Sequence, residues 1–96
     1  MPEISETEAR LKKLRMRSWR RGMKEMDLIL GPFADARLAD LPGPVLDAYE
    51  QVLEENDQDL YLWVTGARPC PDAILPMLEM IAQSAGVRPQ AEKPAD

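Results

Sequence analysis

Apolar residues recur along this chain at three- and four-residue intervals, and glycines and prolines interrupt the pattern. This spacing places apolar side chains on one face of an α-helix, whereas a half-buried strand needs strict alternation. The clearest stripe is Met23, Met26, Leu30 and Phe33. The apolar run 60–64 has no partner of matching pattern, and an isolated strand would leave its backbone unpaired. The sequence therefore predicts an all-α fold, a compact bundle of about five short helices.

Capping and breaking residues set the expected helix boundaries. Residues 5–8, Ser-Glu-Thr-Glu, form a capping box that predicts a first helix over 6–18. A glycine then interrupts the pattern, so a turn is expected over 19–22. Pro32 should kink the second helix or end it two residues earlier, with a further helical turn over 33–40.

The second half of the chain is expected to hold three more helices. The third should follow the turn 41–44, and Asp57 should cap a short fourth helix that Gly66 ends. A stiff loop over 67–71 precedes a fifth helix, which Gly86 closes. The faces expected to be buried in the first, third and fifth helices are Leu11, Leu14 and Ser18; Val45, Leu46, Tyr49, Val52 and Leu53; and Ile74, Leu75, Leu78, Ile81 and Ala85.

The length allows one small domain. We assign residues 6–86 to it, with a flexible N-terminus over 1–5. Residues 87–96 contain two prolines and are predicted to form a disordered tail.

The composition excludes several classes of protein. The chain has one cysteine and no histidine, so an internal disulfide, a Cys/His zinc site and a His-dependent catalytic triad are absent. We expect no catalytic residues and no metal site. No apolar run approaches the roughly 20 residues of a membrane span. The acidic segment 1–8 argues against a secretory signal or an Arg-rich transit peptide, and we therefore expect a bacterial cytoplasmic protein.

Charge is strongly segregated. Residues 10–24 hold eight cations and no carboxylate, whereas residues 25–96 hold fourteen carboxylates and four cations. A basic segment that includes Trp19 could bind nucleic acid, with the indole stacked on a base. The acidic remainder would repel a polyanion, and the net charge of the chain is −5. A nucleic-acid-binding or regulatory module using residues 10–24 is thus the alternative hypothesis.

The pentad 21–25 is poorly suited to stabilising a helix. In a helix, Arg21 and Glu25 would form an i, i+4 pair in the less favourable order, and Gly22 would cost up to about 1 kcal/mol. Poor local choices are expected where function constrains the sequence. Gly22 would let another backbone approach, between a guanidinium donor and a carboxylate acceptor. The sequence therefore predicts a protein-docking face, made of Arg17, Arg20, Arg21, Gly22, Lys24 and Glu25.

The same residues carry a family resemblance. Residues 17–35 resemble the signature helix of the SdhE-type FAD assembly factors of succinate dehydrogenase, whose RGxxE motif matches Arg21, Gly22 and Glu25. The resemblance covers residues 8–85. A second family block, D-x-D-L-x-x-W-x-x-G, matches Asp57, Asp59, Leu60, Trp63 and Gly66.

The resemblance implies a five-helix chaperone that is not itself an enzyme. Such a factor binds the flavoprotein subunit of succinate dehydrogenase, and in some members of fumarate reductase, and promotes covalent attachment of FAD. The attachment chemistry belongs to the flavoprotein. We expect this chain to act as a monomer, to bind no cofactor stably, and to engage neither nucleic acid nor membrane. A helical interaction protein with a partner unrelated to flavin is the third hypothesis.

Overall fold

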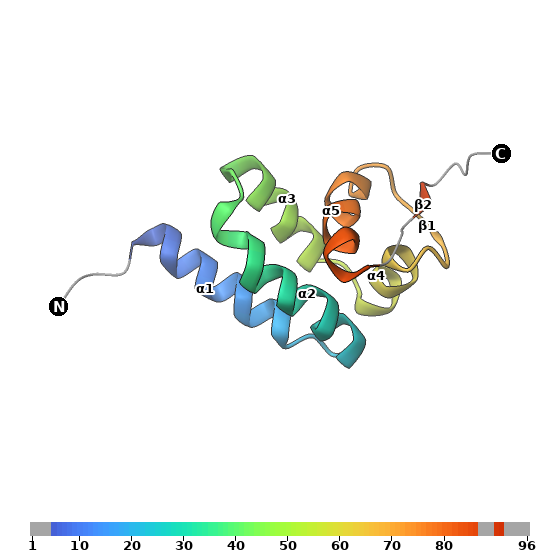
Figure 1. The fold of residues 1–96 in the computed structure, drawn as a ribbon, viewed down its shortest axis with the longest axis horizontal. Helices are drawn as coiled ribbons and strands as arrows, with labels where there is room; N and C mark the ends of the chain where they lie inside the picture. Colours follow the sequence, from blue (N-terminus) through green and yellow to red (C-terminus); the bar gives the residue numbers. More distant parts are fainter. Residues whose placement is uncertain (1–4, 87–89, 92–96) are drawn as a thin grey trace.

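The computed structural model describes residues 5–86 and 90–91, and it confirms the all-α class. Helices α1 and α2 lie side by side as an antiparallel hairpin, and α5 packs against α2, α3 and α4 (Figure 1). The helices are α1 (Glu6–Trp19), α2 (Lys24–Arg37), the 3₁₀ helix η1 (Leu38–Asp40), α3 (Gly43–Leu53), α4 (Asp57–Val64) and α5 (Leu75–Ala85). Among the described residues, no helix is long and apolar enough to span a membrane.

Two very short strands modify the helical prediction. Strand β1 (Pro69–Cys70) pairs in parallel with β2 (Gln90–Ala91), where the sequence predicted a loop and a tail. The apolar run 60–64 lies in α4, as expected from the lack of a matching strand. The rest of the predicted disordered tail, and residues 1–4 of the predicted flexible N-terminus, lie outside the described residues.

The helix ends follow local capping chemistry. The Ser5 hydroxyl accepts the Glu8 amide hydrogen at 3.1 Å, which confirms the predicted N-cap of α1. Helix α4 is capped by Asn56, which accepts the Gln58 amide at 2.8 Å, so the assignment of Asp57 as the cap is wrong. Because the Asn56 side chain caps α4, the Asp57 carboxylate is available to bind groups outside this helix.

Helix α2 runs through Pro32 instead of ending near Leu30, which corrects the predicted boundary. Proline removes one hydrogen bond to the carbonyl four residues earlier, here that of Leu28. Both residues lie on the exposed side of α2, where water can replace the lost donor. A single 3₁₀ turn, η1, then completes the segment that was expected to be helical.

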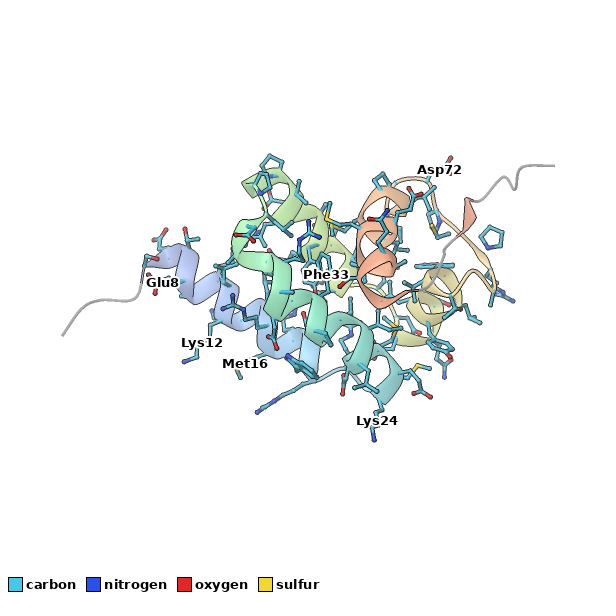
Figure 2. All side chains as sticks on the ribbon, viewed as in Figure 1. Glu8, Lys12, Met16, Lys24, Phe33 and Asp72 are labelled. Carbon is cyan, nitrogen blue, oxygen red and sulfur yellow. The ribbon has the colours of Figure 1, made fainter. Side chains whose placement is uncertain are left out.

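The core forms where the helices meet. Phe33 of α2, labelled in Figure 2, is fully buried, as is Tyr49 of α3. The centroids of their stacked rings lie 5.5 Å apart. The Ser18 hydroxyl donates to the Leu14 carbonyl and lies 2.6 Å from the Tyr49 hydroxyl, so the buried polar groups are paired. Burial raises the pKa of Tyr49 to about 12, which keeps this hydroxyl protonated.

The predicted buried faces hold in part: Leu11, Val45, Ile74 and Leu75 are half-buried against the core, and the buried face of α5 is shifted. Leu14, Ser18 and the third-helix residues 46, 49, 52 and 53 are buried. In α5, Ala85 is exposed, while Met77 and Ala82 are buried beside Leu78 and Ile81. Ala85 is the last residue of α5, so the buried face of the helix ends one turn earlier, at Ile81 and Ala82.

The hairpin of α1 and α2 contains a close contact between Trp19 of α1 and Gly31 of α2. A Cβ atom added at Gly31 would lie 2.3 Å from the Trp19 indole, so only glycine permits this contact. The indole nitrogen also donates to Asp35 at 3.1 Å. Trp19 therefore packs across α2, from the end of α1.

We predict that Gly31→Ala destabilises the fold, because the added methyl group must displace Trp19. Overpacking of this kind costs about 1–3 kcal/mol. Gly43→Ala is the matched control, since a Cβ atom there meets nothing within 4 Å. Urea denaturation of both variants checks the prediction, and equal free energies of unfolding would contradict it.

Candidate docking site around Gly22

Arg21 points from the turn between α1 and α2 into the turn between α3 and α4. Its Nε donates to Asp57 Oδ1 at 2.5 Å, and its two Nη groups donate to the carbonyls of Leu53 and Glu55 at 2.6 and 2.7 Å. The side chains of Arg21 and Asp57 are only 11% and 20% exposed. The guanidinium thus satisfies carbonyls at the end of α3 that have no helical partner.

The backbone of the same turn is held from two sides. The Gly22 amide donates to Asp57 Oδ2 at 2.9 Å, and the Arg21 amide donates to Asp27 Oδ1 at 2.6 Å. Asp57 therefore binds both the side chain of Arg21 and the amide of Gly22. The two sequence blocks that were singled out separately meet at this carboxylate, which fixes the position of Gly22.

The expected helical pairing of Arg21 with Glu25 does not form. Helix α2 begins at Lys24, so Arg21 precedes it and turns inward, and Glu25 is exposed in the first turn. A carboxylate in that position suits the positive end of the helix dipole. The Arg21 guanidinium is consequently a positioning group within the fold and not an outward-facing donor.

Gly22 is exposed and has no structural need to be glycine. Its φ is not positive, since the positive-φ glycines are Gly66 and Gly86. A Cβ atom added at Gly22 would lie 3.5 Å from Asp57 Oδ2, an ordinary van der Waals contact. The conformation and packing of this chain would therefore permit a side chain at position 22.

Shallow depressions lie on both sides of Gly22. One, of about 290 Å³, is lined by Arg17, Arg20, Arg21, Gly22 and Asp57. The other, of about 450 Å³, is lined by Gly22, Met23, Asn56, Asp57 and Gln58. Gly22 and Asp57 border both, so a partner could settle over the glycine and reach into either hollow.

The cations of the basic segment 10–24 fall into two groups, those that form ion pairs within the chain and those that do not. Arg10 binds Asp47 and Glu50 at 2.6 and 2.7 Å, and Arg17 binds Glu54 at 2.6 Å, so these two cations fasten α1 to α3. Hydrogen bonds to Asp47 and Glu50 raise the pKa of Arg10. The other five cations of the segment 10–24, all of it described by the structure, form no ion pair: Lys12, Lys13, Arg15, Arg20 and Lys24.

The structure brings most of the predicted docking residues together. Arg17, Arg20, Arg21 and Gly22 line one depression, while Lys24 and Glu25 occupy the exposed start of α2. Sequence reasoning missed the contribution of Asp57 to this site, because its position favoured a capping role. Within the described residues, no group of three or more His, Cys, Asp or Glu side chains could hold a metal ion.

The arrangement of Trp19 weakens the nucleic-acid hypothesis. One face of the indole lies against Gly31 and its nitrogen donates to Asp35, so a base could reach only the opposite face. Two of the eight cations are also occupied by carboxylates of α3, and a third binds Asp57.

Comparisons with known proteins bear on the same residues. Residues 12–85 match a family described as the flavinator of succinate dehydrogenase. The chain belongs to this family. It is 34% identical over 85 residues to "Succinate dehydrogenase assembly factor 2, mitochondrial" of Yarrowia lipolytica and 39% identical over 85 residues to that of Meyerozyma guilliermondii. The Dictyostelium discoideum protein of the same name is 39% identical over 70 residues.

The alignments cover the chain more fully than its relatives. The alignment with the Yarrowia protein covers 83% of this chain and 59% of the relative, and that with the Meyerozyma protein covers 80% and 63%. The alignment with the Dictyostelium protein covers 73% of this chain and 50% of the relative. The chain thus spans about three-fifths of the length of the two yeast relatives. No solved structure matches the chain.

The expectation of a bacterial cytoplasmic protein is wrong. The relatives of this chain from two yeasts and Dictyostelium all carry the designation mitochondrial. The expectation rested on the acidic character of residues 1–8, and the first residues of a chain that covers only part of its relatives do not reveal a compartment.

We predict that Asp57→Ala lowers the free energy of unfolding by about 3 kcal/mol, because it leaves the largely buried Arg21 without its carboxylate. Asp59→Ala is the matched control in the same helical turn and should cost less than about 1 kcal/mol. Chemical denaturation measures both. An equal loss in the two variants would show that Asp57 does not hold the turn.

Proposed function

We propose that the chain is a chaperone that binds the flavoprotein subunit of succinate dehydrogenase and promotes covalent attachment of FAD to it. The factor itself performs no bond-making step, and the flavoprotein supplies the attachment chemistry. Membership of the flavinator family supports this assignment. The single structural observation that carries it is the exposed Gly22, which has no internal reason to be glycine.

The docking geometry gives each residue of the site a role. Gly22 leaves room for the flavoprotein to approach the backbone closely, between two shallow hollows. Arg20, Lys24 and Glu25 are exposed beside it and can pair with charges of the partner. Arg21 and Asp57 act indirectly, because their ion pair and the hydrogen bond to the Gly22 amide hold the turn in place.

Such docking would favour flavin attachment by selecting one conformation of the partner. A factor that binds the attachment-competent form more tightly than other forms raises its population in proportion to that difference in affinity. This requires no catalytic group on the factor. We propose that it acts as a monomer and that the flavoprotein of fumarate reductase is a second client. Neither nucleic acid nor membrane is needed for this function.

We predict that Gly22→Arg abolishes covalent flavinylation while leaving the bundle folded, because the new side chain projects from the surface into the docking space. Gly43→Arg is the matched control, being the same change at an exposed glycine with nothing within 4 Å of its added Cβ atom. In cells lacking the endogenous factor, covalent flavin fluorescence of the flavoprotein subunit in a denaturing gel measures the outcome. Normal fluorescence with a folded Gly22→Arg protein would contradict the docking assignment.

We also predict that the isolated chain binds no FAD stably. The described residues hold no strand followed by a glycine-rich turn and a helix, the arrangement that cradles a dinucleotide pyrophosphate. Equilibrium dialysis against FAD at micromolar concentration should recover equal flavin on both sides. Retention of stoichiometric FAD by the factor alone would contradict this part of the proposal.

A further inference from the structure

The largest exposed apolar side chains of the described residues gather on one surface. Met16 and Trp19 of α1 are 47% and 40% exposed, and Leu28 of α2 is 57% exposed. Unpaired apolar side chains that cluster together indicate contact with another molecule more strongly than scattered ones do.

Helical spacing explains the cluster. On α1, Lys12, Met16 and Arg20 follow at i, i+4 and i+8, on the side opposite the buried Leu14 and Ser18. On α2, Lys24 and Leu28 share the side whose later turns hold Gly31 and Asp35. Trp19 lies on Gly31 and binds Asp35, so it bridges the two rows.

We call this surface the outer face: Lys12, Met16, Trp19, Arg20, Lys24 and Leu28. Figure 2 shows Lys12, Met16 and Lys24 projecting to the same side, away from α3 and α5. Lys12, Arg20 and Lys24 have no ion-pair partner in the described parts of the chain. The outer face is therefore an apolar strip with a cationic border.

We infer that the outer face is a second docking surface, continuous with the Gly22 site, and that it takes an acidic amphipathic segment of the flavoprotein subunit. This inference rests on the proposed function. Arg20 lines a depression beside Gly22, and Lys24 begins the helix after it, so a partner seated at Gly22 reaches the outer face directly. A segment with apolar side chains flanked by carboxylates matches both the strip and its border.

Other occupants fit the chemistry less well. A second copy applied face to face would oppose cations to cations, which is repulsive. A nucleic acid would use the charges but not Met16 and Leu28, and Trp19 is already covered on one side by Gly31.

Two variants test the inference in binding titrations with the purified flavoprotein subunit of succinate dehydrogenase. Lys12→Glu should weaken binding about 3- to 10-fold at low salt, and the loss should shrink as salt increases. Met16→Ser combined with Leu28→Ser should weaken it about tenfold or more at every salt concentration, because apolar contacts are not screened. Arg68→Glu, the same charge reversal at an exposed position after α4, is the control and should change affinity less than about twofold.

Gly22→Arg, measured in the same titrations, separates the inference from the proposed function. If Gly22→Arg abolishes binding while the outer-face variants bind normally, the outer face is not a docking surface and the proposed function stands. If the unmodified chain does not bind the flavoprotein, both fail. Tight binding of single-stranded RNA, or self-association lost in the Met16→Ser, Leu28→Ser variant, would assign the outer face to a different occupant and overturn the inference.

Discussion

The site depends on one largely buried ion pair. Arg21 and Asp57 lie 36 positions apart in the chain, yet they join the turn before α2 to the turn before α4. Both partners make further hydrogen bonds: the guanidinium also donates to two carbonyls, and the carboxylate also accepts from the Gly22 amide. A buried pair with such partners is costly to break from one side. Its value here lies in fixing a surface loop that would otherwise be free to move.

Around this pair, the helices are fastened by contacts of different kinds. Trp19 packs on Gly31 and locks the α1–α2 hairpin, and the Ser18–Tyr49 hydrogen bond joins α1 to α3 inside the core. On the surface, Arg10 and Arg17 reach carboxylates of α3. These surface pairs are weakened by salt, whereas the buried contacts are not. The arrangement of the helices around the candidate docking site should therefore persist at ionic strengths that screen its exposed charges.

Much of the fold could be predicted from the sequence because it follows from local signals. Local signals are enough to place the start of α1 at the Ser5 cap and the ends of α4 and α5 at Gly66 and Gly86. The apolar spacing of α3 likewise identifies its buried face. The errors arose where distant residues decide the outcome. Asp57 resembles a helix cap in sequence, and only the arrival of Arg21 and Gly22 from another turn reveals its role. Pro32 was expected to kink α2 or end it near Leu30, but the helix continues to Arg37, with Leu30, Phe33 and Ala34 around the proline buried in the core.

Gly22 and Gly31 show why sequence alone could not assign the site fully. Both are glycines in or near one helical hairpin, and neither has a positive φ. Gly31 is required by this chain's own Trp19, so its replacement acts on folding. A Cβ atom at Gly22 meets only an ordinary contact distance, so under the proposed function its replacement would act on docking and not on folding. A loss of function would therefore indicate a folding defect for a Gly31 variant and a docking defect for a Gly22 variant. The two cases differ because the space beside Gly31 is filled by this chain, whereas the space beside Gly22 is proposed to be filled by a partner.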